Sequence, residues 1–289
     1  MRDSQMPPDF VLTLVCPDQR GIVFAVSQFL IKRDCNILDS AQFGDPITGT
    51  FSMRIHFAAE GSIVDAERLC AEFEKVAQGF EMNWEIWDCS IKPKVLIMVS
   101  RQDHCLHDLL YRYRIGELEI AIPAVVSNHE DARVLTESHG IDYHCWPVTA
   151  ANKKAQEGKL IELIEASGID FVVLARYMQV LSGEICARLP ARIINIHHSF
   201  LPGFKGARPY EQAHARGVKL IGATAHYVTS DLDEGPIIEQ DVVRVDHSMS
   251  ARELATLGRD IEKLVLARAT QYQAERRVLL TGSRTVVFR

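Results

Sequence analysis

Two polar side chains near the middle of the sequence have types and spacing that suit acyl chemistry. Residues 192–197 are predicted to be extended, and side chains on a strand alternate between its two faces. Asn195 and His197 therefore point to one side, while Ile196 points to the other. An amide donor beside an imidazole can hydrogen-bond an oxygen that gains negative charge, as the oxygen of a tetrahedral intermediate does. The pair predicts an oxyanion-binding site.

A carboxylate that could complete such a site lies further along the chain. Asp231, Asp233 and Glu234 precede Gly235 in a predicted turn. Asp233 could orient the imidazole, activate a water and carry protons between the attacking and leaving groups. This requires the turn to fold back onto the strand. The alternative is that the histidine is structural and the acidic residues only form the turn.

A zinc site is a second alternative for the same part of the chain. Neutral imidazole is a common zinc ligand, so His197, His198, His214 and His226 could bind zinc together with Asp233. Against this, adjacent residues on a strand point to opposite sides, and no His-x-His or HExxH spacing occurs. We therefore expect no metal.

Composition narrows the class of protein. The chain has 289 residues, 47% of them hydrophobic, and a net charge of −6 without any basic run. This argues against nucleic acid or an anionic membrane as a partner and favours small molecules. Seven cysteines without a CxxC pair predict neither disulfides nor a cysteine zinc site. The sequence has no apolar run long enough for a membrane span, and residues 1–8 lack the apolar segment of a secretory signal. We therefore expect a cytoplasmic protein.

Residues 9–88 have the pattern of a small α/β module. Apolar periodicity and turn-forming residues predict strands, helices and turns in the order βαββαβ. The predicted strands are residues 10–16, 36–43, 50–58 and 80–87, and the predicted helices are residues 21–32 and 63–77. Four strands with two helices on one face is a ferredoxin-like arrangement.

Residues 94–289 have a different pattern, in which buried strands alternate with helices. Predicted strands at 95–99, 120–127, 171–175 and 192–196 alternate with helices that include 106–113 and 154–166, which indicates a Rossmann-like, mostly parallel sheet. Strands at 221–228 and 237–245 should form an antiparallel extension, and a long amphipathic helix at 251–276 should pack across the sheet. Ligands of such sheets lie beyond the carboxyl ends of the strands, where Asn195 and His197 fall.

The motifs in the second region resemble those of a known family. They are Asn195-Ile196-His197, Ser199-Phe200-Leu201-Pro202, Gly206-Ala207-Arg208-Pro209-Tyr210, Gly222-Ala223-Thr224-Ala225-His226, Asp233-Glu234-Gly235 and the tail 282–288. They are similar to the folate-dependent formyltransferase fold over most of residues 94–280 and, within it, to the 10-formyltetrahydrofolate deformylases. Residues 9–88 resemble the ACT domain found at the front of these deformylases.

The resemblance implies hydrolysis of 10-formyltetrahydrofolate to tetrahydrofolate and formate without a cofactor or metal. It implies Asn195, His197 and Asp233 as the catalytic residues. Asn195 and a protonated His197 would hold the oxyanion, and Asp233 would position or deprotonate the water and relay a proton to the leaving nitrogen. Whether Asp233 is the base or only orients its neighbours stays open.

The folate requires an apolar slot lined by some polar backbone. Met178, Val180 and Leu181, which follow a predicted strand, are expected to form one wall, and the loop from Val228 to Leu232 the other. The alternative is that these side chains face the core.

The loop after the first strand of the second region bears on the acceptor. Glycinamide ribonucleotide formyltransferases have a glycine-rich loop there that holds a phosphate through backbone amides. In this chain residues 100–105 contain no glycine and include Asp103. This favours water as the acceptor. Formyl transfer to an amine remains the alternative.

The family resemblance also suggests regulation and assembly. An amino-acid effector would bind near Asp18 and Gly21, between the first strand and helix, and near Asn36, at the start of the next strand. The alternative is that Gly21 has no ligand and is needed only for the conformation of the turn. The ACT resemblance implies a homo-oligomer. A third possibility, an amino-acid sensor with an inactive second domain, is disfavoured by the intact catalytic trio.

Overall fold

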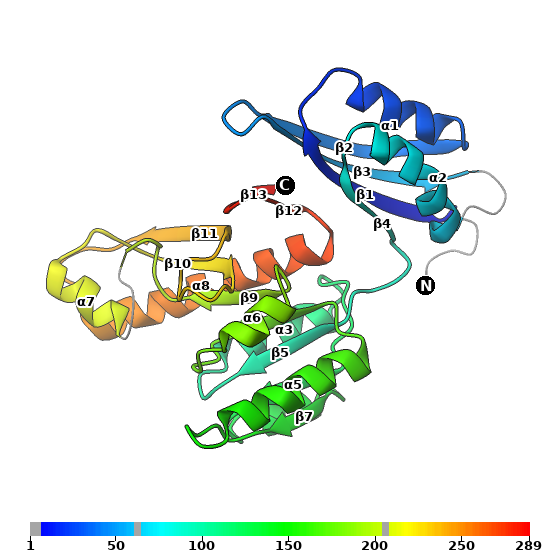
Figure 1. Ribbon diagram of the computed structural model, residues 1–289. Coiled ribbons are helices and arrows are strands. Elements are labelled where there is room, and N and C mark those ends of the chain that lie inside the picture. The colour runs from blue at the N-terminus through cyan, green and yellow to red at the C-terminus, as the bar shows by residue number, and fades with distance from the viewer. Residues whose placement is uncertain (1–6, 61–64, 204–207) are drawn as a thin grey trace. The chain divides into compact units, whose positions relative to one another are not determined.

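The computed structural model describes residues 7–60, 65–203 and 208–289, which form two compact units. The first unit comprises the chain up to Lys92 together with Glu275–Arg289, and the second comprises Pro93–Ala274 (Figure 1). Each unit has its own sheet.

The first unit has the predicted order of six elements. They are β1 (Asp9–Pro17), α1 (Ile22–Ile31), β2 (Cys35–Asp45), β3 (Thr50–Ala59), α2 (Ala66–Gly79) and β4 (Asn83–Asp88). The strands form an antiparallel sheet in the order β2-β3-β1-β4. The two strands that α1 connects, β1 and β2, are separated by β3, and the two that α2 connects, β3 and β4, are separated by β1. This topology is consistent with the ferredoxin-like arrangement.

The core of the first unit lies between this sheet and its two helices. Alternate residues of β1, among them Leu12 and Leu14, are buried against the apolar sides of α1 and α2. Phe29 of α1 and Phe73 of α2 meet edge to face with ring centroids 5.0 Å apart. Buried residues recur at every second position of the strand and about every 3.6 positions of the helices, so both sets face the same core, as the sequence predicts.

The tail of the chain belongs to the first unit, which corrects the expected second domain of 94–289. Residues 275–289 form the hairpin of β12 (Val278–Thr281) and β13 (Arg284–Val287). The guanidinium of Arg54, which is 5% exposed, donates to the carbonyl of Glu275 from Nε at 3.3 Å and Nη2 at 3.1 Å. The Arg276 guanidinium lies 3.4 Å from the ring centre of Trp87. These long-range contacts leave no trace in local composition.

The second unit contains a seven-stranded sheet in the order β11-β10-β9-β8-β5-β6-β7. The strands are β5 (Val95–Val99), β6 (Ala124–Ser127), β7 (Asp142–Cys145), β8 (Phe171–Ala175), β9 (Ile193–His197), β10 (Leu220–Tyr227) and β11 (Ile237–Arg244). Strands β5 to β9 are parallel, and β10 and β11 extend the sheet antiparallel, as predicted. Every residue of β5 and β8 is buried, which explains their continuous apolar sequences.

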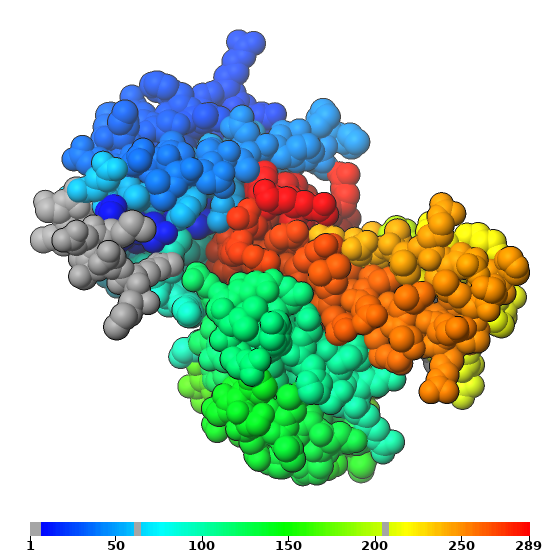
Figure 2. Space-filling view, turned by 180° about the vertical axis from the view of Figure 1, so that it is seen from behind, coloured from blue at the N-terminus to red at the C-terminus, as the bar shows by residue number. Residues whose placement is uncertain are grey.

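Helices cover the sheet of the second unit on its two faces. They are α3 (His104–Arg114), α4 (Arg133–Glu137), α5 (Lys153–Ser167), α6 (Gly183–Arg188), α7 (Pro209–Arg216) and α8 (Ala251–Ala274). Helices α5 and α6 share a core with one face of β5, β6 and β8. Helix α8 packs across β9, β10 and β11, as its apolar stripe predicts, and its outer side is visible in Figure 2.

Four short elements of the second unit were not predicted, and one predicted strand starts later than expected. Strand β7 is a four-residue edge strand of mixed polarity, and α4, α6 and α7 have at most eight residues, too few for a clear helical period. Strand β6 begins at Ala124 instead of residue 120. In the described parts of the chain, no helix combines the length and apolar character needed to cross a bilayer.

Candidate active site

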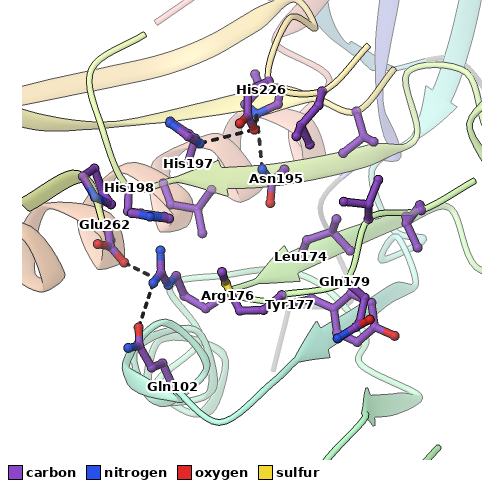
Figure 3. A pocket seen from close by; sticks show the side chains of 18 of the residues that line it. Gln102, Leu174, Arg176, Tyr177, Gln179, Asn195, His197, His198, His226 and Glu262 are labelled. Atoms are coloured by element: carbon purple, nitrogen blue, oxygen red, sulfur yellow. Dashed lines mark hydrogen bonds and ion pairs between the residues drawn. The ribbon is translucent and has the colours of Figure 1, made fainter. Parts of the chain in front are cut away.

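The predicted oxyanion pair lies on β9, where that strand meets the antiparallel extension of the sheet. In the register of β9 and β10, His226 is opposite Asn195 and Thr224 is opposite His197. Residues directly opposite on antiparallel strands point to the same face. A second histidine is therefore added to the predicted pair, and Figure 3 shows Asn195, His197 and His226 converging.

Asp233 reaches this group from the segment between β10 and β11. Its Oδ1 lies 3.3 Å from Nδ1 of His197 and 3.8 Å from Nε2 of His226. The chain folds back tightly here, because the Tyr227 amide donates to the carbonyl of Pro236 at 2.9 Å. The structure thus brings the amide, the imidazole and the carboxylate together, as the sequence hypothesis requires.

Hydrogen bonds fix the orientation of the Asn195 amide. Nδ1 of His226 lies 2.9 Å from the carbonyl oxygen of Tyr227, to which it donates, so Nε2 of a neutral His226 is left as an acceptor. Nδ2 of Asn195 lies 3.3 Å from that Nε2 and donates one hydrogen to it. Burial lowers the pKa of His226, which keeps the ring neutral. Within the described residues the second N–H of Asn195 has no hydrogen-bond partner, so a ligand could accept from it.

The charge state of Asp233 follows from its neighbours. The hydrogen bond with His197 lowers the pKa of Asp233, and this outweighs the effect of burial, which raises it. Asp233 is therefore ionised at neutral pH. Burial and the nearby charge of Arg176 lower the pKa of His198 to about 4, so His198 is neutral. Nε2 of His197 is buried and has no hydrogen-bond partner within the described residues.

One expectation about the histidines is wrong. His197 and His198 were expected to point to opposite sides, but their rings stack with centroids 5.3 Å apart and planes 28° apart. The reason is that β9 ends at His197, so strand alternation does not extend to His198. The alternation argument against a histidine metal site therefore fails.

The residues expected to line the folate slot share one cavity with Asn195, His197 and Asp233. This cavity has a volume of about 550 Å³, which is the size of a ligand pocket. Met178, Val180, Leu181, Val228 and Leu232 all line it. Residues Met178 and Val180 are each 59% exposed and Leu232 is 61% exposed, so these three are not core residues. Leu181 and Val228 also pack against buried residues.

The loop after β5 supports the slot with its side chains. Ser100 Oγ accepts from the backbone amide of Met178 at 3.0 Å and donates to Oδ1 of Asn128 at 2.6 Å. The side chain of Gln102 accepts from Arg176 at 2.8 Å. The polar groups of this loop thus bind the protein itself, in keeping with its lack of glycine. Ser100 acts as a support that sequence reasoning did not identify.

A buried ionic cluster at one end of the cavity was also missed. Glu262 of α8, 1% exposed, accepts from Tyr210 Oη at 2.6 Å, lies 2.9 Å from Nε2 of His104, and lies 3.5 Å from Nε of Arg176. These neighbours lower the pKa of Glu262 against the effect of burial. Arg176, directly after β8, has a φ of 65°, an unusual value for a residue other than glycine. The cluster joins four separate segments, so no local motif predicts it.

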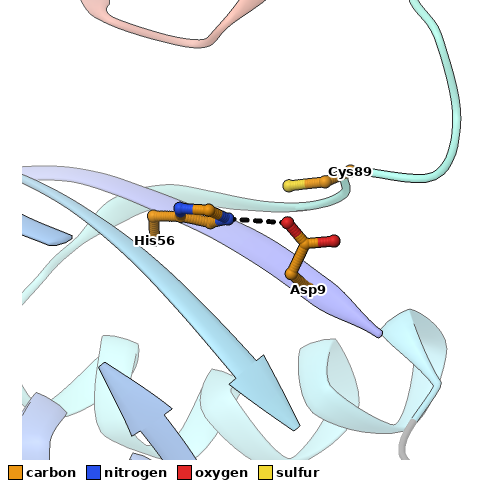
Figure 4. Close-up of side chains that lie close together, drawn as sticks. All are labelled: Asp9, His56 and Cys89. Atoms are coloured by element: carbon orange, nitrogen blue, oxygen red, sulfur yellow. Dashed lines mark hydrogen bonds and ion pairs between the residues drawn. The ribbon is translucent and has the colours of Figure 1, made fainter. Parts of the chain in front are cut away.

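Two groups of side chains bring possible metal ligands within 4.8 Å of one another. One is His104, Cys105 and Glu262 in the ionic cluster. The other is Asp9, His56 and Cys89 in the first unit, where Nε2 of His56 lies 2.8 Å from Oδ2 of Asp9 (Figure 4). In both groups a ring nitrogen of the histidine lies within hydrogen-bonding distance of a carboxylate oxygen, so each histidine already has a protein partner.

The residues expected to bind an effector occupy the β1–α1 loop and β2. Gly21 precedes α1 with a φ of 95°, a left-handed conformation that glycine adopts at low cost. The Asp18 amide donates to the carbonyl of Gly49 at 2.8 Å, and Asn36 pairs with Ala58 across β2 and β3. Within the described residues no hydrogen bond or ion pair joins Asp18 to Asn36. The backbone of Gly21 agrees with a role in the turn.

Comparisons with known proteins agree with this architecture. The formyl transferase family model matches residues 93–270. A formyltetrahydrofolate deformylase of Corynebacterium sp. (strain P-1) is 49% identical over 279 residues, which are 96% of this chain and 98% of the relative. The motif residues Gly206 and Ala207 lie outside the described part of the chain.

Solved structures give the same result. A formyltetrahydrofolate deformylase from Burkholderia mallei has 53% identity and a TM-score of 0.93, covering 98% of this chain and 100% of that chain. Glycinamide ribonucleotide transformylase 1 from Symbiobacterium toebii has 30% identity and a TM-score of 0.63, covering 70% of this chain and 97% of that chain. Because deformylases match over both units, the chain belongs to the formyltetrahydrofolate deformylase family.

Proposed function

We propose that the protein hydrolyses 10-formyltetrahydrofolate to tetrahydrofolate and formate, with Asn195, His197 and Asp233 as its catalytic residues. The observation that carries this proposal is the approach of Asp233 Oδ1 to 3.3 Å from Nδ1 of His197, beside an amide with one free donor. The identity to deformylases over 96% of the chain supports the same reaction.

Asn195 and His197 stabilise the oxyanion. One N–H of Asn195 is used by His226, so the other is held in a fixed direction for the formyl oxygen. His197 contacts ionised Asp233 through Nδ1, which leaves Nε2 for the substrate. Donors held in advance need no reorganisation as negative charge develops on the oxygen, and this lowers the barrier.

Asp233 handles the proton. Its low pKa makes it a carboxylate at neutral pH, so it can accept a hydrogen bond from the attacking water. As water adds to the formyl carbon, a proton reaches the leaving nitrogen and the carbon–nitrogen bond breaks. No step requires a metal or a cofactor, because the three side chains supply the donors and the acceptor.

The folate ring lies in the apolar slot. Met178, Val180 and Leu181 form one wall, and the loop from Val228 to Leu232 forms the other. The exposed side chains of Met178, Val180 and Leu232 would lose solvent contact on binding, which favours an apolar ring. Backbone groups of the loop bind the polar edge of the ring.

Formate release without an acceptor tests this function. Purified protein is incubated with 10-formyltetrahydrofolate, and formate and tetrahydrofolate are measured with and without an added amine. Hydrolysis predicts equal amounts of both products and no dependence on the amine. Product formation only when an amine is present would instead establish a formyltransferase.

The first unit is an ACT-like regulatory domain in this proposal, and the protein is a cytoplasmic homo-oligomer. Its β2-β3-β1-β4 sheet with two helices on one face supports the domain assignment. An amino-acid effector binds near Asp18, Gly21 and Asn36. A ligand that binds the folded state raises the melting temperature, so titration of the twenty amino acids, with an Asn36→Ala control, tests the site.

A further inference from the structure

Arg176 is a buried cation whose hydrogen-bonding capacity is only partly used. Its side chain is 8% exposed, and Nη2 donates to Oε1 of Gln102 at 2.8 Å. Nε lies 3.5 Å from Glu262 in an ion pair without hydrogen-bond geometry. Within the described residues, neither Nε nor Nη1 has a hydrogen-bond partner. A guanidinium carries five N–H donors, so most of its donors are unused.

Glu262 holds the guanidinium in place without satisfying it. The carboxylate oxygens already accept from Tyr210 and contact His104 at 2.6 Å and 2.9 Å. Gln102 fixes the other side of the guanidinium. Arg176 is thus rigidly positioned, and its remaining donors are held for another group.

A third nitrogen atom, on a residue that lines the same cavity, is also buried without a hydrogen-bond partner within the described residues. Nε2 of His197 is buried without a partner, and both His197 and Arg176 line the cavity. The His198 ring stacks on His197, and it is close enough to Arg176 for the charge to lower its pKa (Figure 3). Buried donors without partners are costly, and the cost is removed when a ligand with acceptor atoms binds.

We propose that Arg176 is a binding site for a small monocarboxylate, and that it receives the formate product. This inference rests on the proposed function, because hydrolysis forms formate in this cavity. Water forms a bond to the formyl carbon and the carbon–nitrogen bond breaks. One proton of the water goes to that nitrogen and the other to solvent, which leaves formate with one negative charge and two acceptor oxygens.

The charges along the cavity give the transfer a direction. Formate forms beside Asp233, which is itself an anion, so the two repel. Among the described residues that line the cavity, Arg176 is the buried cation, and charge-assisted hydrogen bonds to carboxylates are stronger than neutral ones. Arg176 therefore takes formate away from the reacting carbon and prevents its return to tetrahydrofolate.

The experiment measures formate binding to the resting full-length protein. The affinity is obtained from the line broadening of 13C-formate in NMR spectra, with chloride at equal ionic strength as the control. Arg176→Met is expected to weaken binding by roughly tenfold or more, as for the loss of a hydrogen bond to a charged group. Arg176→Lys, which keeps the charge, should weaken binding less.

Two further variants exclude general effects of charge and folding. Glu262→Gln removes the anion beside Arg176 and is expected to tighten formate binding severalfold, in the opposite direction to Arg176→Met. Arg259→Gln removes an exposed cation from the lining of the same cavity and should change the affinity less than about twofold. If Arg176→Met does not fold, the formate affinities of Glu262→Gln and Arg176→Lys still test whether formate binds at Arg176.

The outcomes are distinct for this inference and for the proposed function. Unchanged formate affinity in Arg176→Lys and Glu262→Gln, or an equal loss in Arg259→Gln, overturns the Arg176 site while wild-type hydrolysis stands. Absence of formate release by the wild-type protein overturns the hydrolase. Product inhibition by formate that weakens in Arg176→Met but not in Arg259→Gln supports the site during turnover.

Discussion

Gly235 lies so close to Tyr227 that a Cβ atom built on it would be 1.7 Å from the Tyr227 carbonyl oxygen and 3.4 Å from Nδ1 of His226. The same carbonyl accepts from His226 Nδ1. The absence of a side chain at one position thus lets the segment carrying Asp233 fold onto β10. It also protects the hydrogen bond that keeps His226 in the correct tautomer.

Gly235→Ala is therefore expected to lower both the rate and the stability, because a Cβ this close to a backbone oxygen forces the turn to move. The methyl group must displace the turn, and a shift of about 1 Å at a reacting group can cost on the order of 10²-fold in rate. The measurement is kcat with circular dichroism of the same sample. Gly158→Ala in α5, where a Cβ meets nothing within 4 Å, is the control and should keep full activity. Equal rates for the two variants would refute the role of the turn.

Asn195→Ala is expected to give a folded protein with kcat reduced by about 10² to 10³, because one oxyanion donor is lost. His226→Ala acts through the orientation of Asn195, so adding it to Asn195→Ala should cost little more. A double-mutant cycle measures this coupling. A near-normal rate for Asn195→Ala contradicts the assignment, and additive losses contradict the positioning role of His226.

The pH dependence of Asp233 follows from its lowered pKa. A carboxyl group whose pKa is lower in the folded state stabilises that state above the unfolded pKa of about 3.9. This contribution is lost as the pH falls through the lower folded value. Asp233→Asn should be inactive but folded, and its difference in unfolding free energy from wild type should shrink below about pH 4.

Urea unfolding of both proteins between neutral and acidic pH measures this difference. A stability difference that stays constant across the acid range would show that the carboxylate gains nothing from His197. The acid limb of kcat/KM for the wild type should likewise lie below the range of an ordinary aspartate.

Ser100→Ala tests the support of the folate slot. It removes the oxygen that accepts from the Met178 amide and leaves Asn128 without its donor. An unsatisfied buried polar group costs about 1–3 kcal/mol. We expect a severalfold higher KM for 10-formyltetrahydrofolate and a lower melting temperature, with kcat little changed. Ser138→Ala, at an exposed helix end, is the matched control. A normal KM for Ser100→Ala would separate this loop from folate binding.

Metal removal is expected to leave activity unchanged. The proposed reaction uses Asn195, His197 and Asp233 alone, whereas a metal in the group of His104, Cys105 and Glu262 would have to displace the contact of His104 with Glu262. Dialysis against a chelator followed by the formate assay measures this. Loss of activity that zinc restores would contradict the mechanism and direct attention to that cluster.

The sequence predicts the elements with strong periodicity and the chemistry carried by local motifs. Continuous apolar runs identify β5 and β8, and the local motifs around Asn195 and Asp233 predict polar side chains that the fold brings together. Met178 and Val180, expected near a ligand from their place after a strand, do line the cavity.

The remaining parts of the site depend on pairings between distant segments. His226 matters because of its register opposite Asn195, and Arg176 because Glu262 of α8 lies beside it. Neither relationship has a local pattern. The stacking of His198 on His197 was mispredicted because the alternation of a strand was applied to His198, one residue beyond the end of the predicted strand.

The first unit is discontinuous in sequence, because the whole second unit is inserted between Lys92 and Glu275. The hydrogen bond from Arg54 to the Glu275 carbonyl joins its two parts. During synthesis the first unit cannot be completed until residues 275–289 have left the ribosome, long after β1 to β4. Expression of residues 1–92 alone would leave Arg54 its ion pair with Asp39 but remove the Glu275 carbonyl that its Nε and Nη2 contact, so a separately produced first unit should carry the hairpin on a short artificial linker.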